Sequence, residues 1–311
     1  MTVSSNLDIF LNKKVVDYSK DEGIQNPGEF VYRIRISYDD FEDGISIESL
    51  TDDFAKDPNA GQVREIIFGA FDFESSDSTE GIVNKLVEYK NVFKNLKAVF
   101  IGDITFEENE ISWINQSNVG PVLDAYPDLE HFQVRGGNDL SFGKLEHANL
   151  KTLIIETGGL PPNVVKEVSA AHLPNLQKLE MWLGSDNYGF DSTIADFATI
   201  ISGKPFPSLI HLGLMNSEIQ NEIAIEVSKS PILDQLEVLD LSMGILDDKG
   251  GEAILNSEGM KKLKYINLRH HYLSDAMMSK LSARFAEINL DDQEEAEDDD
   301  DESYRYIEVS E

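Results

Sequence analysis

The sequence predicts an α/β repeat protein, with a parallel inner sheet of about ten strands and a mostly helical outer layer. Three observations predict this fold. A short apolar pattern recurs ten times, the spacing leaves room for a loop and a helix after most copies, and amphipathic stretches fill several of these intervals. A chain of 311 residues, of which 41% are hydrophobic, is long enough to bury a full core.

The recurring pattern has two apolar positions separated by two residues, followed after one more residue by a third apolar position. This is L-x-x-L-x-L, the signature of leucine-rich repeats, and its final L-x-L alternates like a strand with one buried face. A strand, loop, helix and return within about 26–28 residues are typical of the long, ribonuclease-inhibitor-like repeat. We therefore expect a leucine-rich-repeat solenoid, or horseshoe. The ten copies begin at residues 63, 96, 129, 150, 176, 209, 236, 263, 285 and 304.

The expected outer helices follow the strands in the repeat intervals. Plausible N-cap residues begin three of these stretches, namely Asn163, Ser192 and Ser274. The clearest amphipathic stretches lie at 162–173, 192–203, 220–230 and 274–285.

The chain ends depart from the repeat, although the whole is expected to be a single domain. Residues 1–62 do not repeat cleanly and are interpreted as an N-terminal cap before the repeat domain at 63–290. Ten acids in the twelve residues 291–302 repel one another, which predicts a disordered acidic loop over 291–303. Residues 304–311 are expected to form a terminal edge strand.

The composition excludes several classes of function. The net charge is −32, and it is still −22 without the ten acids of the run, which argues against binding nucleic acid or anionic membranes. The negative net charge either favours a basic protein partner or serves only to keep the protein in solution. The absence of cysteine excludes disulfides, thiolate zinc sites and cysteine nucleophiles. With neither a signal peptide nor an apolar stretch of about 18 residues, a cytoplasmic location is expected.

The repeat pattern also predicts which residues share the concave face. Positions 3, 5 and 7 of each copy point there, and equal positions form ladders across the strands. The ladders mix aromatic, apolar and charged side chains: Phe100, Trp182, Met215, Arg135, Glu156 and Arg269. Trp and Arg often anchor interfaces, so this face either binds a partner or is buried under loops.

Two short stretches carry candidate chemistry. His270 and His271, with Asp275 nearby, suggest a metal site, but adjacent residues at a strand end point in different directions and no third ligand is fixed by spacing. The acids of residues 103–110 precede Trp113 without the D-x-D-x-D-G spacing of a calcium loop, so we interpret them as part of the loop leaving a strand. No phosphate-binding loop, G-x-S-x-G or H-E-x-x-H motif occurs, so no enzyme activity, cofactor or metal is predicted.

Several blocks resemble a bacterial, cytoplasmic leucine-rich-repeat family of the ribonuclease-inhibitor-like type, a family without an assigned biochemical activity. The blocks include G-D-I-T-F-E-E-N-E-I-S-W-I from residue 102, E-T-G-G-L-P from 156 and L-R-H-H-Y-L-S-D from 268. The resemblance spans about residues 30 to 290 and implies the fold and the location, but no reaction. Matched residue by residue, the blocks fall at strand exits: Asp103, Trp113, Arg135, Glu156, Trp182, His270 and His271.

The sequence therefore predicts a non-enzymatic protein-binding module that holds its partner on the concave face and the strand-exit loops. By fold-level analogy, a cationic toxin or a basic enzyme would be such a partner. Two alternatives stay open: an accessory or substrate protein of a modifying enzyme complex, and a metal-dependent enzyme using His270 and His271. The oligomeric state is left open. The expected partner-binding residues are Phe100, Asp103, Trp113, Arg135, Glu156, Trp182, Met215, Arg269, His270 and His271.

Overall fold

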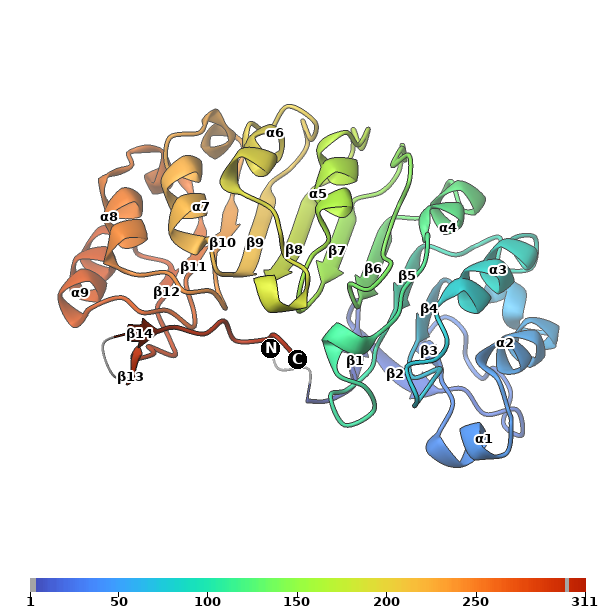
Figure 1. Cartoon of the computed structure of the whole chain (residues 1–311). Coiled ribbons are helices and arrows are strands. Elements are labelled where there is room, and N and C mark those ends of the chain that lie inside the picture. Colours follow the sequence, from blue (N-terminus) through green and yellow to red (C-terminus); the bar gives the residue numbers. More distant parts are fainter. Residues whose placement is uncertain (1–3, 300–301) are drawn as a thin grey trace. The chain divides into compact units, whose positions relative to one another are not determined.

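The computed structural model describes residues 4–299 and 302–311 (Figure 1). It is a mixed α/β structure whose strands are mainly parallel, as the sequence predicts. The chain divides into two compact units, one ending at Ile155 and including Glu311, the other running from Glu156 to Ser310.

The strands of the first unit follow one another in chain order. Only the first pair is antiparallel, and the others whose register is described pair in parallel. The strands are β1 (Ile9–Phe10), β2 (Lys13–Asp17), β3 (Phe30–Ile34), β4 (Glu65–Phe68), β5 (Ala98–Ile101), β6 (His131–Arg135) and, at the boundary, β7 (Thr152–Glu156). The helices are α1 (Tyr38–Glu42), α2 (Ile47–Lys56), α3 (Glu80–Glu88) and α4 (Gly120–Ala125), with 3-10 turns η1 (Ala60–Gln62) and η2 (Ile111–Trp113).

The second unit repeats the same alternation of strand and helix. Its parallel strands are β8 (Lys178–Gly184), β9 (His211–Ser217), β10 (Val238–Asp240), β11 (Tyr265–Asn267) and β12 (Ile288–Asn289). The helices are α5 (Pro162–Ser169), α6 (Ala198–Ile201), α7 (Gln220–Val227), α8 (Asp248–Asn256) and α9 (Asp275–Arg284). The 3-10 turns are η3 (Asp186–Tyr188), η4 (Ile194–Phe197), η5 (Pro231–Asp234) and η6 (Gly259–Lys262).

The strand register places equal positions of neighbouring repeats side by side. In the first unit Phe100 pairs with Ile67 on one side and Gln133 on the other. In the second unit Gly213 pairs with both Glu180 and Asp240. These pairings match the predicted ladders, because strands spaced about 4.8 Å apart bring equal positions into contact.

The hydrophobic core lies between the sheet and the helices that line one of its faces in each unit (Figure 1). Val99 and Ile101 of β5 and Ile82 and Leu86 of α3 are fully buried, because alternate strand residues and one helix face point into this layer. Ser274 caps α9 as predicted, by accepting the backbone N–H of Met277 at 3.2 Å.

Two other predicted helix starts differ. The backbone of α5 begins directly at two prolines, Pro161 at the cap and Pro162 at the first turn, rather than at an Asn163 cap. Thr193, not Ser192, caps η4 in a capping box with Asp196. A proline has no backbone N–H that would be left without an acceptor at a helix start, so it is favoured there.

The chain ends contain regular structure outside the repeats that the sequence predicts. The described residues 4–62 contain the strands β1 to β3 and the helices α1 and α2. Within the acid run, β13 (Glu297–Asp299) and β14 (Glu302–Tyr304) pair as an antiparallel ladder, and Asp300 and Asp301 lie outside the described residues. Residues 305–310 have no strand assignment, in contrast to the expected edge strand. Among the helices of the described residues, none combines the length and hydrophobicity needed to cross a bilayer.

We predict that Gly102→Ala destabilises the protein, because Gly102 has φ +104° and a Cβ there would lie 2.5 Å from the carbonyl oxygen of Arg135. The backbone conformation alone costs a non-glycine residue about 1–3 kcal/mol, and the clash adds to it. Urea unfolding followed by circular dichroism measures the change. Gly28→Ala is the control, since nothing lies within 4 Å of a Cβ there. Equal unfolding midpoints for the two variants would contradict the prediction.

Candidate functional site

The loop leaving β5 is fastened to the first unit by a buried carboxylate. Asp103 is 0% exposed, and its side chain accepts the backbone N–H of Leu7 at 3.2 Å and Nη1 of Arg33 at 2.8 Å. Its backbone carbonyl accepts Nδ2 of Asn6 at 2.7 Å. These bonds join the N-terminal segment to the loop that leaves β5. Breaking the ion pair would leave a buried charge without a partner, so the pair is costly to separate.

A second carboxylate shapes the same loop. Oε2 of Glu108 accepts the backbone N–H of Thr105 at 2.9 Å and its hydroxyl at 3.1 Å, while Oε1 lies 2.8 Å from Nη2 of Arg35. Two of the four acids in this stretch are therefore bonded within the protein. Of the other two, Glu107 is exposed and Glu110 is half-buried.

The fastened loop presents two aromatic side chains to solvent. Phe106 is 50% exposed and Trp113 is 54% exposed, whereas Ile111 and Ile114 beside Trp113 are fully buried. The buried isoleucines and the carboxylate bonds restrict the loop before any partner arrives. We call residues 104–113 the exit loop.

The predicted face residues of the first unit lie beneath the N-terminal hairpin. The Phe10 ring stacks on Phe100 with 6.3 Å between ring centroids, and Phe100 is fully buried. The Arg135 guanidinium lies 5.4 Å from the Phe100 ring, and its Nη1 donates to the carbonyl of Ile104 at 3.0 Å. Of the two interpretations left open by the sequence, burial describes Phe100 and Arg135 in this structure.

Burial also describes the corresponding residues of the second unit. Trp182 on β8 pairs in register with Met215 on β9, and their exposed fractions are 5% and 8%. The carbonyl of Trp182 accepts the hydroxyl of Thr157 at 2.9 Å. Glu156, at the start of this unit, is 6% exposed. These side chains need a rearrangement of the surrounding chain before they can touch a partner.

The C-terminal segment, residues 304–310, is bound to the strand exits of the second unit. The Asn216 side chain pairs with the backbone of Val309 in both directions, accepting its N–H at 3.0 Å and donating to its carbonyl. The backbone N–H of Glu308 donates to the carbonyl of Met243 at 2.9 Å. The backbone of this segment is therefore held by the Asn216 side chain and by the carbonyl of Met243.

A forked ion pair holds the same segment. The guanidinium nitrogens of Arg269 lie 2.6 Å and 2.8 Å from the two carboxylate oxygens of Glu308, and Nε lies 2.6 Å from Asp292. Burial opposes the charged form of Glu308, but the bonds from Arg269 outweigh it and hold the pKa of Glu308 below its usual range. Arg269, a predicted partner residue, is thus engaged within the chain.

The two adjacent histidines bond to backbone groups. Nε2 of His270 lies 3.1 Å from the carbonyl of Tyr306. Nε2 of His271 lies 3.1 Å from the carbonyl of Leu290, and Nδ1 accepts the N–H of Leu273 at 3.2 Å. Burial lowers the pKa of His271, which keeps the ring neutral. Both ring nitrogens of His271 are occupied, so the ring has no free ligand atom for the metal that the sequence alternative requires.

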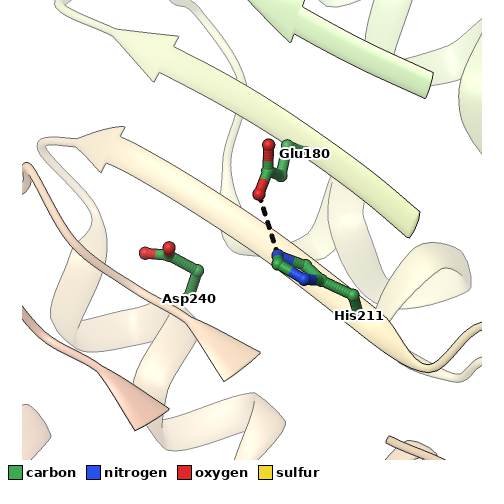
Figure 2. Close-up of side chains that lie close together, drawn as sticks. All are labelled: Glu180, His211 and Asp240. Atoms are coloured by element: carbon green, nitrogen blue, oxygen red, sulfur yellow. Dashed lines mark ion pairs between the residues drawn. The ribbon is translucent and has the colours of Figure 1, made fainter. Parts of the chain in front are cut away.

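A different cluster has ligand geometry. Glu180, His211 and Asp240, hereafter the polar triad, lie on three successive strands (Figure 2), and one ligand atom from each lies within 4.8 Å of the others. Nε2 of His211 is 2.8 Å from Oε1 of Glu180, and Nζ of Lys178 is 2.9 Å from the same oxygen.

The two carboxyl groups of the polar triad differ in their environments. Burial would raise the pKa of Glu180, but the close contact of His211 and the charge of Lys178 outweigh it and lower that pKa. Burial dominates at Asp240 and raises its pKa, although Ser242 and Asn267 donate to its carboxylate. The sequence analysis did not identify this cluster. Its signal was present in the ladders, where Glu180 and Asp240 flank Gly213 and His211 precedes that glycine by two residues.

The ten predicted partner residues thus fall into three groups. Trp113 is exposed, and Arg269 and His270 are half-buried and bonded to the C-terminal region. The remaining seven are buried: Phe100, Asp103, Arg135, Glu156, Trp182, Met215 and His271.

We expect Glu308→Gln to loosen the C-terminal segment, because it removes the charge that Arg269 binds. A hydrogen bond to a charged group contributes about 1.5–3 kcal/mol, so hydrogen exchange at the Val309 amide should accelerate clearly. The lowered pKa of Glu308 means that the pair stabilises the segment above the usual glutamate pKa and is lost as pH falls through the folded value. The variant should lack this acid dependence. Glu295→Gln, at an exposed position, is the control, and equal exchange in both variants would contradict the prediction.

Comparisons with known proteins identify a relative among the solved structures. Neither a scan of family models nor a search of curated proteins found a match. A protein from Bacteroides fragilis, solved in a structural genomics programme, is 37% identical, with a TM-score of 0.80 over 89% of this chain and 76% of that chain. An internalin from Listeria monocytogenes is 14% identical over 79% of this chain and 83% of that chain, and its TM-score of 0.29 supports no structural argument. The chain belongs to the same family as the Bacteroides fragilis protein.

Proposed function

We propose that this protein is a non-enzymatic, protein-binding leucine-rich-repeat module of the ribonuclease-inhibitor-like type. The repeat assignment is supported by the position of the strands, since each of the nine copies that begin between residues 63 and 285 contains one strand, from β4 to β12. Helices or 3-10 turns follow most of these strands. Such repeats bury their apolar faces by stacking, which leaves loops and one sheet face for recognition.

The exposure of Phe106 and Trp113 on the fastened exit loop carries the proposal. Two large aromatic side chains that are half-exposed on a restricted loop leave apolar area in water that a partner can cover. Binding to a loop that is already ordered loses little conformational entropy. Tryptophan is also among the residue types that contribute most to interface energy.

The charge of the chain favours a basic partner. The net charge of −32 produces a negative field around the molecule, and Glu107 lies exposed beside Phe106. Such a field accelerates the approach of a cationic protein and weakens with salt. A cationic toxin or a basic enzyme fits this chemistry.

The proposed contact is centred on the exit loop of the first unit, with Trp113 as its anchor. The other nine predicted partner residues are buried or bonded within the chain, so a partner reaches them only if the surrounding chain rearranges. Their role in the described structure is to support the strands and loops from behind. A variant of Trp182 therefore makes a poor test, because at 5% exposure its loss would damage the core.

We predict that Trp113→Ala weakens partner binding at least about tenfold without changing the unfolding midpoint, because an interface anchor is lost from a solvent-exposed position. A photoreactive residue placed at 113 in the full chain should cross-link one protein from native lysate, identified by mass spectrometry. Binding of that purified protein to wild type and variant is then measured by titration, and affinity should fall as salt rises.

Tyr38, which is 59% exposed on α1 of the same unit, provides the matched control. Tyr38→Ala should bind like wild type, and a photoreactive residue at 38 should not capture the same protein. Unchanged affinity in Trp113→Ala would refute the proposed contact. A covalent mass increase on the chain itself would support the alternative in which it is the substrate of a modifying enzyme.

A further inference from the structure

The polar triad is built into the sheet of the second unit rather than into a loop. Glu180 comes from β8, His211 from β9 and Asp240 from β10, so the paired strands fix all three backbone positions (Figure 2). Ligands mounted on strands are held more accurately than ligands on mobile loops. The side chains lie on the same sheet face because their positions in the repeat have the same parity.

A glycine makes the approach of the side chains possible. Gly213 lies between Glu180 and Asp240 in the register. A Cβ at 213 would lie 2.8 Å from Cγ of Glu180, which shows that the Glu180 side chain leans into the space left by the glycine. Its carboxylate points toward His211 on β9 (Figure 2).

His211 is incompletely satisfied in this arrangement. Its Nε2 is buried and makes no well-aligned hydrogen bond, although it lies 2.8 Å from Glu180. Nearby, Asp240 is 8% exposed with its carboxylate fixed by Ser242 and Asn267. A buried imidazole nitrogen directed at one carboxylate and close to a second is a combination that a cation would satisfy.

We propose that Glu180, His211 and Asp240 bind a divalent transition-metal ion, for which Zn²⁺ is the appropriate probe. Zinc takes imidazole nitrogen and carboxylate oxygen ligands at about 2.0–2.2 Å, and two ligands of a tetrahedral ion are roughly 3.3 Å apart. The triad atoms lie within 4.8 Å of one another, so small side-chain rotations bring them to that spacing. Three protein ligands leave a fourth position for water. An imidazole and two carboxylates disfavour Mg²⁺ and Ca²⁺, which prefer oxygen ligands alone.

Lys178 competes with the metal in this arrangement. Its ammonium group already lies 2.9 Å from Oε1 of Glu180, and its side chain is 36% exposed. A flexible, partly exposed lysine can turn toward water when a divalent ion takes its place. Removing its charge should therefore tighten metal binding.

The test uses the full chain, stripped with chelator and titrated with Zn²⁺ by calorimetry in excess Mg²⁺. We expect one Zn²⁺ to bind per wild-type chain, above the weak, non-stoichiometric binding of the acidic surface. His211→Gln and Asp240→Asn should reduce this affinity by about 100-fold or more, because each removes a ligand. Lys178→Gln should increase it by about tenfold, because a nearby positive charge is removed.

Two matched variants control for charge and for histidine number. His172→Gln and Glu287→Gln change exposed residues of the same unit and should bind Zn²⁺ like wild type. Thermal unfolding without metal establishes that each variant folds, and Zn²⁺ should raise the unfolding temperature of wild type but not of His211→Gln. The proposal is overturned if neither wild type nor Lys178→Gln binds Zn²⁺ stoichiometrically. It is also overturned if His211→Gln binds Zn²⁺ as tightly as they do.

Discussion

The parallel pairing of successive strands, with equal repeat positions side by side, is the constraint on which the rest of the structure depends. One strand with its helix cannot bury both apolar surfaces, so each repeat needs its neighbours to complete the core. The pairing of Phe100 with Gln133 and of Glu180 with Gly213 shows the same register in each unit. This register decides which side chains share a surface, and every candidate site follows from it.

Two ion pairs, one buried and one partly buried, help to connect the chain ends to this framework. Asp103 binds Arg33 and the backbone of Leu7 in the first unit, and Glu308 binds Arg269 in the second. In both, a strand-exit position that sequence analysis assigns to a partner is occupied by a terminal segment of the same chain. A charge removed from water is costly unless an opposite charge lies close to it. Here Arg33 provides that charge for Asp103, and Arg269 provides it for Glu308.

The exposed aromatic residues of the exit loop and the polar triad of the sheet suit different kinds of ligand. Phe106 and Trp113 remain exposed because the loop that carries them is ordered by carboxylate bonds and by buried isoleucines, not by packing of the aromatic rings themselves. The polar triad has the opposite character, because its members lie close together around a glycine. The first arrangement suits a protein surface, and the second suits a small cation. Neither depends on the other, since they lie in different compact units.

By itself, the sequence determined the α/β class, the strand positions from residue 63 to 289 and the ladders, because these depend on the local alternation of apolar residues. It also contained the members of the polar triad at ladder positions where they could be found. Only the tertiary structure decided that Phe10 covers Phe100, that residues 304–310 bind the strand exits and that His271 is bonded to backbone. These contacts join residues far apart in the chain, and no local periodicity encodes which distant segment comes to cover a given face.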